Sequence, residues 1–270
     1  KHVKVLILDE ADRMLDMGFI EDVETIIKNC PRERQTLLFS ATISNEIERL
    51  SSKYMKNPVF VSAEAYVDPK KLAQLFYDVP QDMKFSLLVH LLKEEQGRLI
   101  MVFCNTRRNA DMVSSNLQRY QLDAMAIHGG LTQNKRNAIM KSFHSGRACI
   151  LVCTDVAARG LDIKNVSHVY NYDIPNSGAD YVHRIGRTAR AGKEGIAISL
   201  VTPRDYDNFR HVSQDIDMTI AHKEVPQIEQ LNVAFHRGRE NRQGGRFGRG
   251  GPRGGSRGRF NDRGRRRYGR

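Results

Sequence analysis

Two carboxylates follow directly on a short apolar run near the start of the sequence. Val5 to Leu8 are apolar, and Asp9 and Glu10 come next. An apolar run this short, bounded by charge, predicts a strand buried on both faces of a parallel sheet. In open α/β sheets, ligands bind at the carboxyl ends of the strands. Asp9 and Glu10 are therefore placed where they could meet a metal-bound phosphate, although an ordinary strand followed by a charged loop explains the same residues.

A second set of groups suited to phosphate lies far along the chain. Arg187 and Arg190 are spaced i, i+3, so on a helix both side chains would point the same way. Planar guanidinium groups match the geometry of phosphate oxygens. A solvated basic helix face would show the same spacing, so the pair alone does not establish a site.

The elements that would position these residues alternate between strand and helix. In the first part of the chain we expect strands at 5–8, 36–39 and 59–61 and helices at 14–29 and 45–55. Further on we expect strands at 75–79, 99–104, 124–127, 149–153, 166–171 and 195–201. Helices are expected between them, with a last helix over 203–214. This alternation predicts an α/β fold built on doubly wound parallel sheets.

Length and charge divide the chain into parts. A chain of 270 residues suits about two domains. We expect half of a first domain at 1–63, a polar linker at 64–71, a complete second domain at 72–225 and a tail at 226–270. Of the net charge of +12, residues 236–270 carry +11, from thirteen arginines against two acidic residues. That segment has no aliphatic side chain, so we expect it to be disordered.

Composition also excludes several classes of protein. Four scattered cysteines are too few for a disulfide framework, and we expect all four to be reduced thiols. No stretch is long or apolar enough to span a membrane, and no signal peptide is visible. We therefore expect a cytoplasmic protein that does not bind membranes.

Five short motifs stand at predicted strand ends or loops, in a fixed order. They are DEAD at 9–12, SAT at 40–42, VFCNTR at 102–107, TDVAARGLD at 154–162 and HRIGRTAR at 183–190. Together they resemble the DEAD-box ATP-dependent RNA helicases of superfamily 2. The resemblance covers residues 3 to about 225 and implies two RecA-like domains, the first only in part. The family's GxxxxGK[ST] phosphate loop does not occur in this sequence, so we expect an N-terminal truncation and a fragment without ATPase activity of its own.

The resemblance implies an ATP site with Mg²⁺, divided between the two domains. Asp9 would hold Mg²⁺ through water, and Glu10 would activate the attacking water. From the second domain, Arg187 and Arg190 would act as arginine fingers at the γ-phosphate. The remaining roles implied are side-chain contacts across the cleft by Asp12 and His183, ribose binding by Asp162, and coupling of ATP to RNA by Ser40 and Thr42. Ala189 departs from the family, which has glycine there.

RNA contacts are expected at strand ends and helix starts, where backbone N–H groups and hydroxyls can bind phosphate. Because such contacts recognise backbone and 2′-OH groups, we expect single strands and short duplexes to bind with little sequence preference. Caps and turns use the same residue types. The candidates are Asn105, Thr106, Arg107, Gly129, Gln133, Arg136, Thr154, Arg159 and Gly160, with Arg249 and Arg253 in RGG units of the tail.

Three functions remain open at this stage. The first is an RNA helicase that separates short duplexes locally as ATP is hydrolysed. The second is an RNA-binding or annealing module that works without ATP. The third is a superfamily 2 DNA helicase, which a comparison of RNA and DNA as stimulators of ATP hydrolysis would distinguish.

Overall fold

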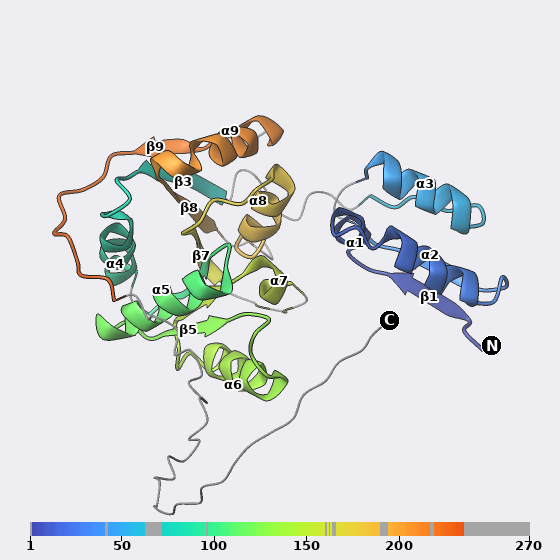
Figure 1. Cartoon of the computed structure of the whole chain (residues 1–270), viewed down its shortest axis with the longest axis horizontal. Helices are drawn as coiled ribbons and strands as arrows, with labels where there is room; N and C mark the ends of the chain where they lie inside the picture. The colour runs from blue at the N-terminus through green and yellow to red at the C-terminus, as the bar shows by residue number, and fades with distance from the viewer. Residues whose placement is uncertain are drawn as a thin grey trace, which may run out of the picture. The chain divides into compact units, whose positions relative to one another are not determined.

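Residues 72–234 form a domain around a seven-stranded sheet (Figure 1). The computed structural model describes residues 2–40, 43–62, 72–95, 97–159, 161, 163, 166–189, 194–216 and 219–234. The strand order is β5-β6-β4-β7-β8-β3-β9, and every pair is parallel. The expected doubly wound parallel sheet is confirmed. The strands are β3 (Leu72–Asp78), β4 (Leu99–Phe103), β5 (Ala124–Ile127), β6 (Ile150–Cys153), β7 (Val166–Asn171), β8 (Gly195–Val201) and β9 (Ala221–Lys223).

Helices pack on both faces of this sheet. The buried clusters place α4 (Lys84–Glu94) and α5 (Arg107–Arg119) on one face. The other face carries α6 (Gln133–His144), α7 (Asp155–Ala158), α8 (Gly178–Ile185) and α9 (Tyr206–Asp215), the last preceded by a 3₁₀ turn, η2 (Pro203–Asp205).

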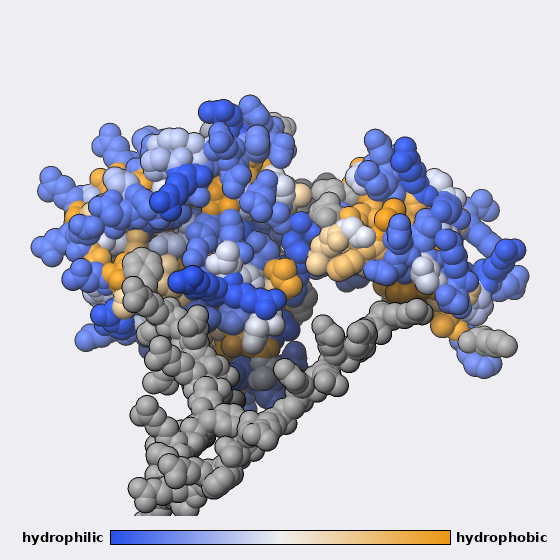
Figure 2. All heavy atoms as spheres, viewed as in Figure 1, coloured by the Kyte–Doolittle hydropathy of each residue, from blue (hydrophilic) through white to orange (hydrophobic). Residues whose placement is uncertain are grey.

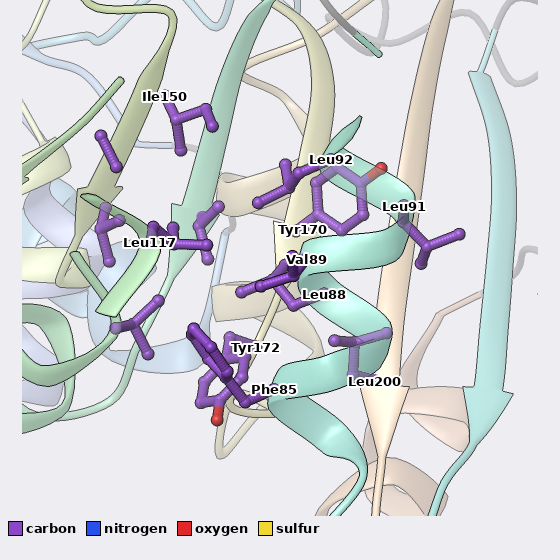
Figure 3. Close-up of a cluster of buried hydrophobic side chains, with 14 of the residues drawn as sticks. Phe85, Leu88, Val89, Leu91, Leu92, Leu117, Ile150, Tyr170, Tyr172 and Leu200 are labelled. Carbon is purple, nitrogen blue, oxygen red and sulfur yellow. The ribbon is translucent and has the colours of Figure 1, made fainter. Parts of the chain in front are cut away.

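The alternation along β4 shows why the central strands are apolar throughout. Ile100 and Val102 pack with α4 and α5, whereas Met101 and Phe103 pack with α6 and α7. Successive side chains of a strand point to opposite faces, so a strand covered on both sides needs an apolar residue at every position. Figure 3 shows the first of these clusters, in which α4 side chains lie against Tyr170, Tyr172 and Leu200.

An extended segment, residues 224–234, continues the chain past β9 and packs beside α4 and α5. We call it the strap. Its apolar side chains at Val225, Ile228, Leu231 and Val233 join the cluster under α4. In Figure 1 it runs from β9 past α4 toward α5. Leu87 and Leu91 are buried as well as the residues of α4 that face the sheet, so this helix is apolar on nearly all sides. A helix of this kind must be covered on its outer side too, and the strap covers it.

Side chains of the domain bind the strap backbone. The Asn116 amide accepts a hydrogen bond from Ala234 N–H (2.8 Å) and donates to Ala234 C=O (2.9 Å). Ser86 Oγ accepts from Leu231 N–H (2.9 Å), and Tyr120 donates to Asn232 C=O (2.9 Å). The predicted boundary at residue 225 is therefore wrong, because residues 226–234 belong to the folded domain. An isolated extended segment of this kind has no helical or strand periodicity by which the sequence could place it.

The described part of residues 1–63 is a two-stranded parallel sheet with three helices. The strands are β1 (Val5–Leu8) and β2 (Gln35–Leu38), and the helices are α1 (Ala11–Asp16), α2 (Ile20–Asn29) and α3 (Asn45–Tyr54). Leu6 and Leu8 pack with Val23, Ile27 and Leu50 on one face. Val5 and Ile7 point to the other face and are 47% and 57% exposed.

Three predictions for this part are therefore wrong. β1 is not buried on both faces, because the three described helices of this part pack on the same face of the sheet. Residues 59–61 form no strand, since β1 and β2 pair only with each other among the described residues. Val59 and Val61 are almost fully exposed, and apolar atoms reach the surface of this part of the chain in Figure 2. The helix predicted over 14–29 is two helices, because Gly18 adopts a positive φ of 76° between them.

Other predictions concern residues in both parts. The bounds predicted for β5, β7 and β8 are confirmed, whereas α7 and β9 were not predicted. All four cysteines are free thiols, as expected, and burial raises the pKa of Cys104 and Cys153. The predicted linker, 64–71, and the tail beyond residue 234 lie outside the described residues.

The strap yields a test of where the domain ends. Ending the chain after Glu224 should lower the free energy of unfolding by about 3 to 5 kcal/mol, because apolar burial and the Asn116 hydrogen bonds are lost. Ending it after Phe235 should change stability by less than about 0.5 kcal/mol. Urea unfolding measures both. Equal stability of the two shortened chains would contradict this account of the strap.

Candidate functional site

The loops after β4, β5 and β6 lie side by side, because these are neighbouring strands of one parallel sheet. They carry most of the predicted RNA contacts of the second domain. Thr106 precedes α5 and its Oγ1 accepts a hydrogen bond from Asn109 N–H (3.1 Å), while Thr132 caps α6 in the same way (3.5 Å). The N-termini of α5 and α6 therefore lie at this edge, where their free backbone N–H groups can bind an anion.

Other predicted RNA contacts surround these helix starts. Gly129 follows β5, and the Arg107 guanidinium lies beside it, 3.4 Å from where a Cβ would stand. Gln133 opens α6 and accepts a hydrogen bond from Arg136 (3.5 Å). Thr154 is buried at the start of α7. The structure thus brings these residues to one edge of the sheet, and their roles stay predictions.

A buried guanidinium, to which we assigned no role from the sequence, holds this edge together. Arg184 is only 1% exposed. It binds Asp155 through two parallel hydrogen bonds, Nε to Oδ1 and Nη2 to Oδ2, both 2.7 Å long. Nη2 also donates to Asn105 Oδ1 (2.7 Å), and Nη1 donates to the Asp173 carbonyl (2.6 Å). Its position in HRIGRTAR was the only signal in the sequence.

This network connects the loops after β4, β6 and β7 to α8. Asn105 also donates from its backbone to Asp173 Oδ2 (2.9 Å) and from its side chain to Ile174 C=O (2.8 Å). The Asn109 amide reaches the same Asp173 oxygen (3.0 Å). Asn105, predicted to contact RNA, is therefore fixed by three hydrogen bonds of its own side chain and backbone. Its described contacts make it a residue that positions the loop.

The DEAD loop has a strained backbone at the predicted general base. Glu10 adopts φ 51° and ψ 46°, the left-handed region, at the N-cap of α1. For a residue with a side chain this costs roughly 1 to 2 kcal/mol, and such strain concentrates at functional sites. Asp9 is exposed, and its Oδ1 accepts the Glu10 N–H (2.9 Å). The strained residue is thus the one predicted to act as the general base.

Asp12 and Ser40 connect this loop to the loop after β2. Asp12 is buried, and its Oδ1 accepts a hydrogen bond from Arg13 N–H (2.9 Å). The Asp12 N–H donates to Ser40 Oγ (3.3 Å). Ser40, predicted to couple ATP to RNA, therefore contacts the DEAD motif directly.

Contacts between α1 and α8 involve a residue that we did not predict. Arg13 donates from Nε to His183 Nδ1 (3.2 Å) and from Nη2 to Asp180. Arg159, predicted to bind RNA, donates to the same Asp180 oxygen (3.1 Å). One carboxylate is thus shared by two guanidinium groups. Asp180 as well as Arg13 was missed, because neither lies within the part of a motif to which we assigned chemistry.

Burial and charge shift two pKa values in this cluster. Burial alone would raise the pKa of Asp180, but hydrogen bonds and charges from Arg13, Ser177 and Arg159 together lower it. Burial lowers the pKa of His183, and the Arg13 charge lowers it further. Both shifts favour an ionised carboxylate beside a neutral imidazole. A neutral His183 can accept the Arg13 hydrogen bond at Nδ1.

Arg187 does not lie on a helix, whereas a helix from about residue 179 to Arg187 is what the sequence pattern predicts. α8 ends at Ile185, and the chain then turns so that Thr188 Oγ1 donates to Val166 C=O (2.6 Å) at the sheet edge. Arg187 donates to Leu161 C=O (3.1 Å). Ala189 adopts a positive φ of 55°, which glycine adopts without strain, so the departure from the family motif falls on a strained position. Gly195 leaves room for this turn, since a Cβ there would meet Thr188 and Ala189 within 3 Å.

Several predicted residues lie outside the described part of the chain, namely Thr42, Gly160, Asp162, Arg190, Arg249 and Arg253. Among the described residues, no three His, Cys, Asp or Glu side chains are grouped so as to hold a metal ion. No described helix has the length and apolarity to cross a membrane.

Comparisons with known proteins bear on this arrangement. The family described as "DEAD/DEAH box helicase" matches residues 1–50, and "Helicase conserved C-terminal domain" matches residues 83–192. The chain is 42% identical to the solved structure of the Escherichia coli DEAD-box protein SrmB bound to RraA, covering 91% of that chain and 57% of this one, with a TM-score of 0.55. The chain belongs to the DEAD-box helicase family.

Other DEAD-box proteins resemble it over a larger part of its length. The ATP-dependent RNA helicase CshA of Listeria monocytogenes is 49% identical over 214 residues, 79% of this chain and 41% of the relative. Dbp5 of Saccharomyces cerevisiae, solved with RNA and ADP BeF₃, is 29% identical with a TM-score of 0.74, covering 83% of this chain and 60% of that one. The chain spans about half the length of the curated DEAD-box relatives or less. The RecA-like fold is confirmed.

The Arg184 network should contribute to the stability of this DEAD-box chain, which a substitution can test. Arg184→Lys should lower the free energy of unfolding by about 3 kcal/mol, because lysine cannot reproduce the two-pronged bond and leaves Asp155 with an incomplete partner. Arg210→Lys is the matched control, since Arg210 on α9 is exposed and should tolerate the change within about 0.5 kcal/mol. Denaturant unfolding measures both, and a loss below 1 kcal/mol for Arg184→Lys would contradict the role of the network.

Proposed function

We propose that the whole protein is an RNA helicase that couples RNA-stimulated ATP hydrolysis to local unwinding of short RNA duplexes. The observation that carries the proposal is the set of loops after β4, β5 and β6, which lie side by side with two helix N-termini. Such an edge offers backbone donors and arginines to consecutive phosphates of one strand. RNA rather than DNA is the proposed substrate because the relatives are named as ATP-dependent RNA helicases.

ATP and Mg²⁺ are the expected ligands of the DEAD loop. Mg²⁺ retains most of its water and binds one or two carboxylates together with substrate phosphates. Asp9 is an exposed carboxylate and could bind Mg²⁺ in this way, since a set of three protein ligands is not needed. Mg²⁺, when bound, neutralises charge on the phosphates. Glu10, held beside Asp9 by the strained turn, orients the attacking water and accepts its proton.

The second domain supplies positive charge to the same reaction. Arg187 and Arg190 stabilise the γ-phosphate, and Asp162 binds the ribose. Asp12 and His183 belong to the contact between the two parts, where Arg13 binds His183. Ser40 contributes through its hydrogen bond with Asp12, and Thr42 acts with it. These groups couple the state of ATP to the position of the RNA loops.

RNA would be held through its backbone and 2′-OH groups, with little sequence preference. The RGG units at Arg249 and Arg253 add contacts to phosphates and bases. We further propose that the protein acts in the cytoplasm. The sequence contains no GxxxxGK[ST] loop, so the full-length protein, rather than this chain alone, would hydrolyse ATP.

Replacing the predicted general base tests the proposed function. In the full-length protein, Glu10→Gln should lower RNA-stimulated ATP hydrolysis at least about 100-fold, because the amide cannot accept the proton from water. Affinity for RNA should remain within about twofold, since Glu10 is not an RNA contact. Steady-state hydrolysis with RNA, with DNA of the same sequence and without nucleic acid measures the effect.

Glu21→Gln is the control, because Glu21 is an exposed carboxylate on α2 close by in sequence. It should hydrolyse ATP at the wild-type rate. Full activity of Glu10→Gln would sink the assignment of the base, and equal stimulation by DNA would contradict the assignment of RNA as substrate.

A further inference from the structure

His128 organises the turn that follows β5. The ring is 6% exposed and lies between two partners. Its Nε2 is 2.9 Å from Asp111 Oδ1 on α5, and its Nδ1 accepts a hydrogen bond from Gly130 N–H (3.1 Å). The turn is closed by Leu131 N–H, which donates to His128 C=O (3.2 Å). His128 thus connects the side of α5 to the backbone of the His128–Leu131 turn.

These two contacts define the tautomer of the ring. A backbone N–H can only donate, so Nδ1 must be unprotonated to accept from Gly130. In a neutral imidazole the proton is then on Nε2, from which it is donated to the Asp111 carboxylate. Both ring nitrogens are therefore used, and the two bonds together fix the ring plane as well as its position.

The glycines of the turn leave space for the His128 ring and for Arg107. A Cβ on Gly130 would stand 3.1 Å from His128 Nδ1, closer than side chains usually approach. A Cβ on Gly129 would stand 3.4 Å from the Arg107 guanidinium. Gly129 is exposed, and within the described residues its N–H has no hydrogen-bond acceptor. One backbone donor and one guanidinium therefore lie together at the surface of the turn.

We propose that His128 is a positioning residue for RNA, which with Asp111 fixes the turn so that Gly129 N–H and Arg107 bind the same phosphate. The inference rests on the proposed function for its ligand, whereas the hydrogen bonds of His128 do not depend on it. By accepting the Gly130 N–H, the imidazole leaves Gly129 as the outward donor of the turn. Removing this bond frees the turn and separates the two phosphate ligands.

Two isosteric variants separate the two contacts of the ring. Asparagine at position 128 can place its Oδ1 near the site of Nδ1, which keeps an acceptor for Gly130 and loses the bond to Asp111. Glutamine can place its amide near Nε2, which keeps the bond to Asp111 and loses the acceptor. Both are compared with His128→Ala and the wild-type chain of 270 residues, using a single-stranded oligouridine RNA as the probe.

RNA affinity should stay high only in variants that keep a hydrogen-bond acceptor at the position of His128 Nδ1. We expect His128→Asn to bind within about threefold of wild type and His128→Gln and His128→Ala to bind about tenfold more weakly, as for the loss of one charged hydrogen bond. The hydrogen-exchange rate of the Gly130 amide should stay slow in His128→Asn and rise in the other two. Unfolding by urea checks that all variants remain folded under the binding conditions.

The outcomes distinguish the two proposals. Equal RNA affinity for His128→Asn and His128→Gln, with different protection of the Gly130 amide, would overturn the positioning role. Equal protection of that amide in all variants would overturn the hydrogen bond itself. If the wild-type chain does not bind the RNA, the RNA-binding edge of the proposed function and the positioning role both fail, while the exchange rates still show whether His128 fixes the turn.

Discussion

A single buried charge constrains the functional edge of the second domain. Burying an arginine costs several kcal/mol of folding free energy unless its donors are paired. The partners of Arg184 lie on several different loops, which must therefore come together around it. Asp155, Asn105 and the Asp173 carbonyl come from the loops after β6, β4 and β7. The guanidinium also lies over the Phe103 ring, with Cζ 5.2 Å from its centroid. The positions of the predicted RNA loops and of α8 are thus coupled through one side chain.

Backbone strain occurs next to the residues predicted to bind ATP. Glu10 and Ala189 both adopt left-handed backbone conformations, one beside the predicted magnesium ligand and the other beside the predicted arginine fingers. Asp180 is shared by Arg13 and Arg159, so one carboxylate binds two guanidinium groups. Apolar clusters hold both strained positions in place. Ala189 is packed in the cluster that contains residues of α8 and α9, and the DEAD loop follows β1, whose Leu8 is buried with residues of α2 and α3.

The sequence predicted what depends on local pattern and failed where distant residues decide. β5, β7 and β8 were placed correctly, because strands covered on both faces are short apolar runs between turn residues. The strap was missed, since it packs by single anchors such as Leu231 without any period. The motifs located the site, yet Arg184 and Arg13 were overlooked because their partners lie 11 to 170 residues away in the chain, and Asp180 was overlooked with Arg13, which it binds. Residues 59–61 were misassigned, because a strand needs a neighbour that sequence alone does not supply.

We propose that the loops after β4, β5 and β6 together form one RNA-binding edge. Hydrogen exchange of the 270-residue chain, measured with and without a single-stranded RNA, tests it most directly. RNA should slow exchange together at residues 105–107, 129–130 and 154–159, and Arg184→Lys should weaken the protection at all three. Protection confined to one loop, or to the segment after residue 235 alone, would show that the loops do not form one edge.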